Sequence, residues 1–94
     1  MTNKEIYEYH GWREQCKHIT SEMYELTEAI HDYELSNSNP SKWYNVVEEL
    51  ADVLFMLNQI KDNYDISNHN IKLWGDFKHK RESKRIKEGY DESR

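Results

Sequence analysis

Apolar residues recur at intervals of three and four along most of this chain, which is the spacing of a helix face rather than of a strand. One proline and three glycines interrupt the sequence, which is few for a chain built from strands and turns. The pattern therefore predicts an all-α protein, a helical bundle with about three main helices in each chain.

The first predicted helix carries one apolar stripe, and Asn3 is its expected N-cap. Gly11 lies inside this stretch, and we expect it to break or bend the helix. The polar run at 36–40 should end it. The stripe expected to face the core consists of Tyr9, Trp12, Cys16, Ile19, Met23, Leu26, Ile30 and Tyr33.

A second helix is predicted after Ser41, which could cap it. A short link at 65–68 then leads to a third helix at about 69–88, which begins with apolar residues and becomes basic in its later turns. The tail at 89–94 is expected to fray. The second stripe consists of Trp43, Val46, Leu50, Val53, Leu57, Ile60 and Tyr64, and the third of Ile71, Trp74 and Phe77.

The composition limits the core that one chain can form. The 94 residues suffice for one domain, which we expect to span 1–94, and only 36% of them are hydrophobic. A lone chain of this kind buries a modest core. We therefore predict that the bundle is completed by oligomerisation, as a homodimer or a homotetramer.

Charge is distributed unevenly along the chain. The formal net charge is −5, but the stretch from His69 to Lys87 is strongly basic. This asymmetry favours a local anion site over a surface that coats a nucleic-acid polymer. Cys16 is the single cysteine and cannot form an internal disulfide, and no apolar run suits a signal peptide or a membrane span. We expect a cytoplasmic protein without a membrane partner.

Two acidic pairs stand beside the apolar stripes, Glu22 with Glu25 and Glu49 with Asp52. Residues three apart share a helix face, so each pair points two carboxylates the same way. If the first two helices pack antiparallel, the pairs can converge at the edge of the core. Clustered carboxylates need a counter-charge, and magnesium, with manganese as the alternative, takes oxygen ligands. Spacing alone leaves ordinary surface acids as the competing interpretation.

These acids give the chain a family resemblance. It resembles the all-α nucleoside triphosphate pyrophosphohydrolases, the MazG-like and dimeric dUTPase group, whose motifs are Glu-Glu-x-x-Glu followed by Glu-x-x-Asp. Glu22, Glu25, Glu49 and Asp52 stand at the matching positions. Ser21 stands where the family has its first glutamate. The departure removes one carboxylate and raises the prospect of reduced activity.

Flanking segments extend the resemblance over roughly residues 12–87. Trp12 and Gln15 lie in a segment like the one before the family's first motif, and Lys78, Arg81 and Arg85 resemble the basic segment near the end of compact members. The resemblance implies that these basic residues grip phosphates, where guanidinium groups suit bidentate contact. A solvated, charged helix end is the alternative for any one of them.

The resemblance further implies a magnesium-dependent hydrolase that splits a nucleoside triphosphate, NTP or dNTP, into the monophosphate and pyrophosphate, as nucleotide-pool house-cleaning. The four carboxylates would be metal ligands, and one of them or Glu48 would orient the attacking water. Trp12 is the best candidate for stacking on a base, beside Gln15, although Trp12, Trp43 and Trp74 all fall on apolar stripes typical of core. Ser21 favours the alternative, a catalytically weak nucleotide-binding sensor or a helical interaction module.

Overall fold

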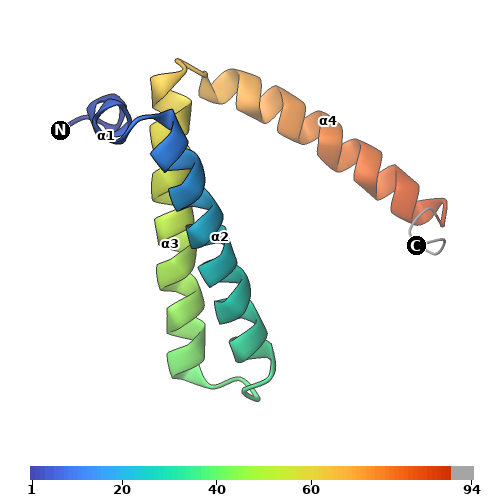
Figure 1. Cartoon of the computed structure of the whole chain (residues 1–94). Helices are drawn as coiled ribbons and strands as arrows, with labels where there is room; N and C mark the ends of the chain where they lie inside the picture. Colours follow the sequence, from blue (N-terminus) through green and yellow to red (C-terminus); the bar gives the residue numbers. More distant parts are fainter. Residues whose placement is uncertain (90–94) are drawn as a thin grey trace.

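The computed structural model describes residues 1–89, and this part of the chain consists of four helices and no strands (Figure 1). The helices are α1 (Asn3–His10), α2 (Trp12–Glu34), α3 (Pro40–Asn63) and α4 (Asn68–Lys87). The predicted all-α class is confirmed. Gly11 breaks the first predicted helix into α1 and α2, so residues 1–89 hold one helix more than the three main ones predicted. Residues 90–94 of the expected tail lie outside the described residues.

Two predicted caps are wrong by one or two positions. Thr2, not Asn3, caps α1: its hydroxyl accepts a hydrogen bond from the Glu5 amide at 3.1 Å, and the Glu5 carboxylate accepts one from the Thr2 amide at 3.0 Å. This reciprocal pair of hydrogen bonds needs a Glu three residues after the cap, and Glu5 stands at that position relative to Thr2. Asn39 caps α3 and accepts a hydrogen bond from the amide of Ser41 at 2.9 Å.

Gly11 forms the corner between α1 and α2 in a conformation that other residues rarely adopt, with φ 83° and ψ 154°. Its amide still donates to the Tyr7 carbonyl at 2.9 Å, which closes the last turn of α1. A carbon added at Gly11 would meet nothing within 4 Å. Glycine is therefore needed at this corner for its backbone dihedral angles, and not because a side chain would clash with a neighbour.

We expect Gly11→Ala to lower the free energy of unfolding by about 1–3 kcal/mol, because only glycine adopts this region of φ and ψ without strain. Urea unfolding followed by circular dichroism, at one fixed chain concentration, measures the loss. An unchanged free energy of unfolding would show that the corner has relaxed to an ordinary conformation.

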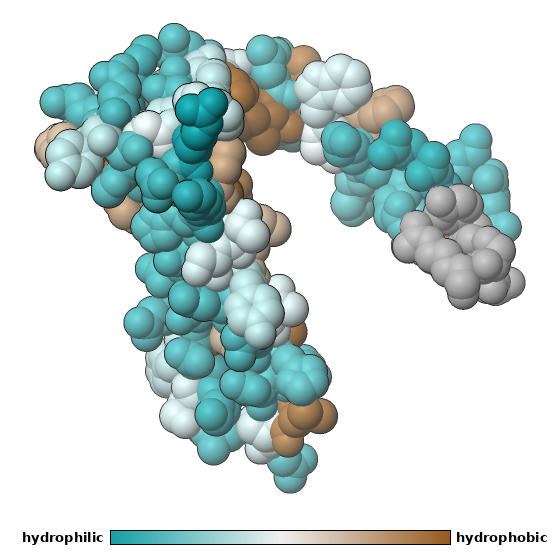
Figure 2. Space-filling model, viewed as in Figure 1, coloured by the Kyte–Doolittle hydropathy of each residue, from teal (hydrophilic) through white to brown (hydrophobic). Residues whose placement is uncertain are grey.

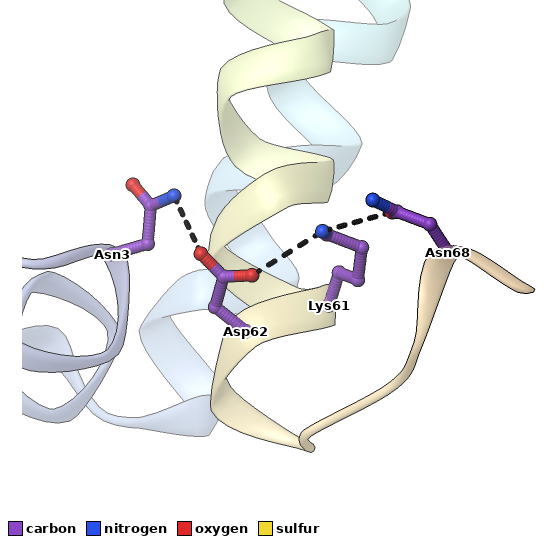
Figure 3. A network of polar contacts seen from close by, with 4 residues as sticks. All are labelled: Asn3, Lys61, Asp62 and Asn68. Atoms are coloured by element: carbon purple, nitrogen blue, oxygen red, sulfur yellow. Dashed lines mark hydrogen bonds and ion pairs between the residues drawn. The ribbon is translucent and has the colours of Figure 1, made fainter.

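Helices α2 and α3 form an antiparallel hairpin, and α1 packs across the C-terminal part of α3 (Figure 1). The Tyr7 and Tyr64 hydroxyls lie 2.9 Å apart, and this hydrogen bond is the main reason that the pKa of Tyr7 rises to about 12. The Asn3 amide donates to Asp62 at 2.9 Å, which lowers the pKa of that carboxyl (Figure 3). These polar contacts fasten α1 to the hairpin.

The buried core is small. Within residues 1–89, the buried hydrophobic residues are Tyr7, Ala29, Val53 and Met56, joined by the buried polar residues Gln15 and Gln59. The apolar faces of α2 and α3 are wider than the seam between them, so much of each predicted stripe is left exposed in the single chain. The prediction that Trp12, Cys16, Met23, Ile30, Trp43, Leu50 and Leu57 face the core of this chain is wrong for that reason. Tyr9 and Tyr64, at the ends of the first two stripes, are exposed as well. Ile71, Trp74 and Phe77 are exposed because α4 packs on no other helix in the described part of the chain.

Helix α4 leaves the hairpin and packs against none of the other helices in the described part of the chain (Figure 1). Its first turn is held by Lys61, which donates to the Asn68 side chain at 3.0 Å (Figure 3). The radius of gyration is 16.8 Å, against about 12 Å for a compact domain of this length. Apolar surface gathers at the corner where α4 departs, and hydrophilic surface covers its later turns (Figure 2).

Candidate metal centre

Three of the four predicted carboxylates meet where α2 and α3 face each other. Glu22 and Glu25 come from α2 and Glu49 from α3, and each offers one oxygen within 4.8 Å of the others. The antiparallel hairpin brings them together because the two acidic motifs lie at matching heights on its two helices. Asp52, the fourth predicted ligand, is exposed and lies outside this group.

The cluster concentrates negative charge between the two helices. One oxygen of Glu22 and one of Glu49 are buried and have no hydrogen-bond partner among residues 1–89. Loss of hydration raises the pKa of Glu49, and the charge of Glu25, followed by those of Asp52, Glu22 and Glu48, raises it further. Buried polar atoms normally have a partner. Carboxylate oxygens arranged in this way fit a hard divalent cation such as Mg²⁺ or Mn²⁺.

His18 is a neighbour of the cluster that sequence reasoning missed. Its Nε2 lies 3.3 Å from an oxygen of Glu22, one helical turn further along α2. The spacing of four residues could have identified the contact, because such residues are adjacent on a helix. Glu22 is the less exposed partner, with 16% of its side chain accessible against 52% for His18.

Gln15 and Trp12, both predicted to bind the nucleotide, have different surroundings. Gln15 is 2% exposed and donates to the side-chain oxygen of Gln59, also 2% exposed, at 2.6 Å. In this single chain Gln15 is therefore closed off from solvent. Trp12 is 56% exposed, and the Arg13 guanidinium lies over its ring, 4.7 Å from the ring centroid. Gln59 was also missed, although it follows Val53 and Met56 at intervals of three.

The predicted phosphate-binding residues lie on another part of the chain. Lys78, Arg81 and Arg85 are all on α4, which does not pack against the helices that carry the carboxylates. Lys78 borders a shallow groove whose other walls include Ile71 and Trp74. The chain by itself thus separates the acidic cluster from the basic residues.

The fold and this site define a class: an all-α protein with a carboxylate cluster, suited to a divalent cation, between two antiparallel helices. The family model described as the MazG nucleotide pyrophosphohydrolase domain matches residues 13–69. The chain therefore belongs to the MazG nucleotide pyrophosphohydrolase family, as the resemblance predicted. No match was found among curated proteins or among solved structures. Within residues 1–89, no helix has the length of apolar sequence that crossing a membrane requires.

Proposed function

We propose that this protein is a magnesium-dependent nucleoside triphosphate pyrophosphohydrolase, which converts an NTP or dNTP to the monophosphate and pyrophosphate. The observation that carries the proposal is the meeting of Glu22, Glu25 and Glu49 in a member of the MazG family, with one oxygen each of Glu22 and Glu49 buried and without a partner among residues 1–89. The proposal includes house-cleaning of the cytoplasmic nucleotide pool, which suits a family defined by nucleotide pyrophosphohydrolase chemistry.

The proposed roles follow from the chemistry of the side chains. Glu22, Glu25 and Glu49 would hold Mg²⁺ or Mn²⁺, with Asp52 as the fourth ligand one turn from Glu49. Such ions, when bound, neutralise phosphate charge and lower the pKa of a coordinated water. One of these carboxylates, or Glu48, would orient the attacking water.

The nucleotide needs contacts beyond the carboxylates. Lys78, Arg81 and Arg85 would bind phosphate oxygens, and the exposed ring of Trp12 would stack on the base, with Gln15 becoming available only if its buried pairing with Gln59 opens. Trp12 lies about 15 Å of helix rise from Glu22, a span suited to the two ends of a nucleotide.

A homo-oligomer forms part of the proposal because one chain leaves a broad apolar stripe uncovered on α3. The stripe residues recur at intervals of three and four and are each between 44% and 50% exposed: Trp43, Val47, Leu50, Leu54 and Leu57. A stripe with this spacing is typical of a seam between packed helices. A second copy would cover it and enlarge the small core.

Pyrophosphate release from a panel of canonical and modified nucleoside triphosphates tests the function. We expect turnover with Mg²⁺ and none in EDTA. Absence of turnover for every nucleotide, from folded protein, would contradict the enzymatic proposal.

Ser21 supports a second candidate, because it stands exposed beside Glu22 where the family has a glutamate. In that case the protein would be a nucleotide-binding sensor or an interaction module. Thermal stabilisation by nucleotide without turnover would identify the sensor, and no stabilisation would identify the module. Turnover gained by Ser21→Glu in an inactive wild type would trace the loss to this position.

A further inference from the structure

His18 contacts the carboxylate cluster, and none of the roles proposed above uses it. Its Nε2 lies 3.3 Å from Oε1 of Glu22. In the part of the chain that the structure describes, this is the one ion pair that reaches Glu22, Glu25 or Glu49. An ionised carboxylate only accepts hydrogen bonds, so the imidazole must present an N–H at Nε2 in this contact.

The two oxygens of Glu22 have different surroundings. Oε1 faces His18, whereas Oε2 is buried and has no hydrogen-bond partner among residues 1–89. Oε2 of Glu49, on the opposite helix, is buried and without a partner in the same way. The contact with His18 thus occupies one oxygen of Glu22 and leaves the other available to a cation between α2 and α3.

A helix-stabilising pair is the ordinary explanation for a contact between residues four apart, and it fits His18 poorly. Pairs of this spacing are more favourable when the acid precedes the base, and here the base precedes the acid. Both residues lie more than one turn from either end of α2, outside the turns where charge interacts with the helix dipole. The pair therefore contributes little to the stability of the helix itself.

His18 also lies outside the group that could bind a cation directly. One oxygen from each of Glu22, Glu25 and Glu49 lies within 4.8 Å of the others, and His18 is not a member of this group. Its side chain is 52% exposed against 16% for Glu22, so His18 stands on the solvent side of that carboxylate. Its place is behind a metal ligand rather than among the ligands.

We propose that His18 is a positioning residue of the metal centre: its Nε2–H binds Oε1 of Glu22, restricts the rotamer of that side chain and directs Oε2 toward the cation. A glutamate held in this way loses less conformational freedom when it binds a metal. Loss of a hydrogen bond to a metal ligand typically weakens metal binding roughly 10- to 100-fold. The inference rests on the metal-binding part of the proposed function and adds to it a residue outside the acidic motifs.

Mn²⁺ binding to the nucleotide-free protein tests this role without reference to turnover. The Kd is measured from the EPR signal of free Mn²⁺ at about pH 8, where imidazole is largely neutral. We expect His18→Leu, which has no donor, to raise the Kd about 10-fold. His18→Gln should recover most of the loss, because its amide can donate to Glu22 one turn further on. His31→Leu on the same helix, where His31 is exposed beside Asp32, is the matched control and should bind Mn²⁺ like the wild type.

Thermal melts in EDTA separate positioning from folding. The metal-free Tm of His18→Leu should stay within about 2 °C of the wild type, because the pair adds little to the helix. A lower metal-free Tm with an unchanged Kd would show a purely structural contact and overturn the proposal. Equal losses of affinity in His18→Leu and His18→Gln would overturn it too, as would an imidazole nitrogen bonded directly to Mn²⁺ in the pulsed EPR spectrum of the bound ion.

The possible results distinguish this inference from the enzymatic proposal. Absence of Mn²⁺ binding by folded wild type would overturn the metal centre and the role of His18 together. Wild-type affinity in His18→Leu would overturn the role of His18 alone, whatever the turnover. Mn²⁺ binding that depends on His18, in a protein that hydrolyses no nucleotide, would support the positioning role and contradict only the enzymatic proposal.

Discussion

Glu49→Gln should lower kcat/KM for magnesium-dependent pyrophosphate release on the order of 10³-fold. Glu49 is the one member of the close acidic group that comes from α3, so its loss leaves Glu22 and Glu25 without a ligand from the opposite helix. Stabilisation of phosphate charge by a bound metal is worth several kcal/mol, and each 1.36 kcal/mol corresponds to a tenfold change in rate. Glutamine keeps the shape of the side chain, so the hairpin should remain folded.

Steady-state assays across Mg²⁺ concentrations measure this loss. Glu34→Gln, which removes the same charge from the exposed end of α2, is the matched control and should retain wild-type activity. Full activity in Glu49→Gln would place the metal elsewhere, whereas equal losses in both variants would point to a general effect of net charge.

The sequence was sufficient to predict the helices and the acidic hairpin. Helical spacing, a polar break at 36–40 and scarce turn residues indicate α2 and α3, and a short loop makes them antiparallel. Once they are antiparallel, Glu22 and Glu49 must face each other because their motifs lie at matching heights. These deductions need only local rules and one topological step.

Burial was harder to predict, because a stripe of apolar residues does not show which of its edges is covered. In α3 the seam takes Val53 and Met56, while Leu50 and Leu54 on the same broad face stay exposed. Gln15 and Gln59 are buried although their side chains are polar, because each satisfies part of the other's hydrogen bonding. Such pairs depend on tertiary register, which one sequence does not specify.

The direction in which α4 leaves the hairpin also could not be predicted from the sequence. Its helix was predicted within one residue at each end, at about 69–88 against the observed Asn68–Lys87. Its departure from the hairpin depends on a few link residues, among them Asp65 with a positive φ that sequence patterns rarely reveal. The relation between basic residues and carboxylates could therefore not be obtained from motif spacing.

Removal of Mg²⁺ should destabilise the wild type at pH 7 and should not destabilise Glu49→Gln. At a Mg²⁺ concentration of 100 times its Kd, binding adds about 2.7 kcal/mol to the free energy of unfolding. For a chain of this size that corresponds to a rise in Tm on the order of 10 °C. In EDTA, Glu49→Gln should melt above the wild type, because it removes a half-buried charge repelled by Glu25 and Asp52.

The pH dependence has a definite sign. Because the pKa of Glu49 is raised above its ordinary 4.5 in the folded chain, the folded state binds a proton more tightly than the unfolded state. This contribution to stability is fully present below pH 4.5 and is lost as pH rises through the higher, folded value. Metal-free wild type should therefore lose stability through that window, and Glu49→Gln should lose less.

Thermal melts in EDTA and in excess Mg²⁺, repeated across pH at one chain concentration, test both statements. Glu8→Gln on α1 removes a charge away from the cluster and should keep the full Mg²⁺-dependent rise in Tm. The same Mg²⁺ shift in wild type and Glu49→Gln would rule out this carboxylate as a ligand. A Tm for Glu49→Gln in EDTA below that of the wild type would instead mean that the Glu49 carboxylate already has a stabilising partner in the metal-free protein. That result would contradict the proposal that the cluster needs a cation.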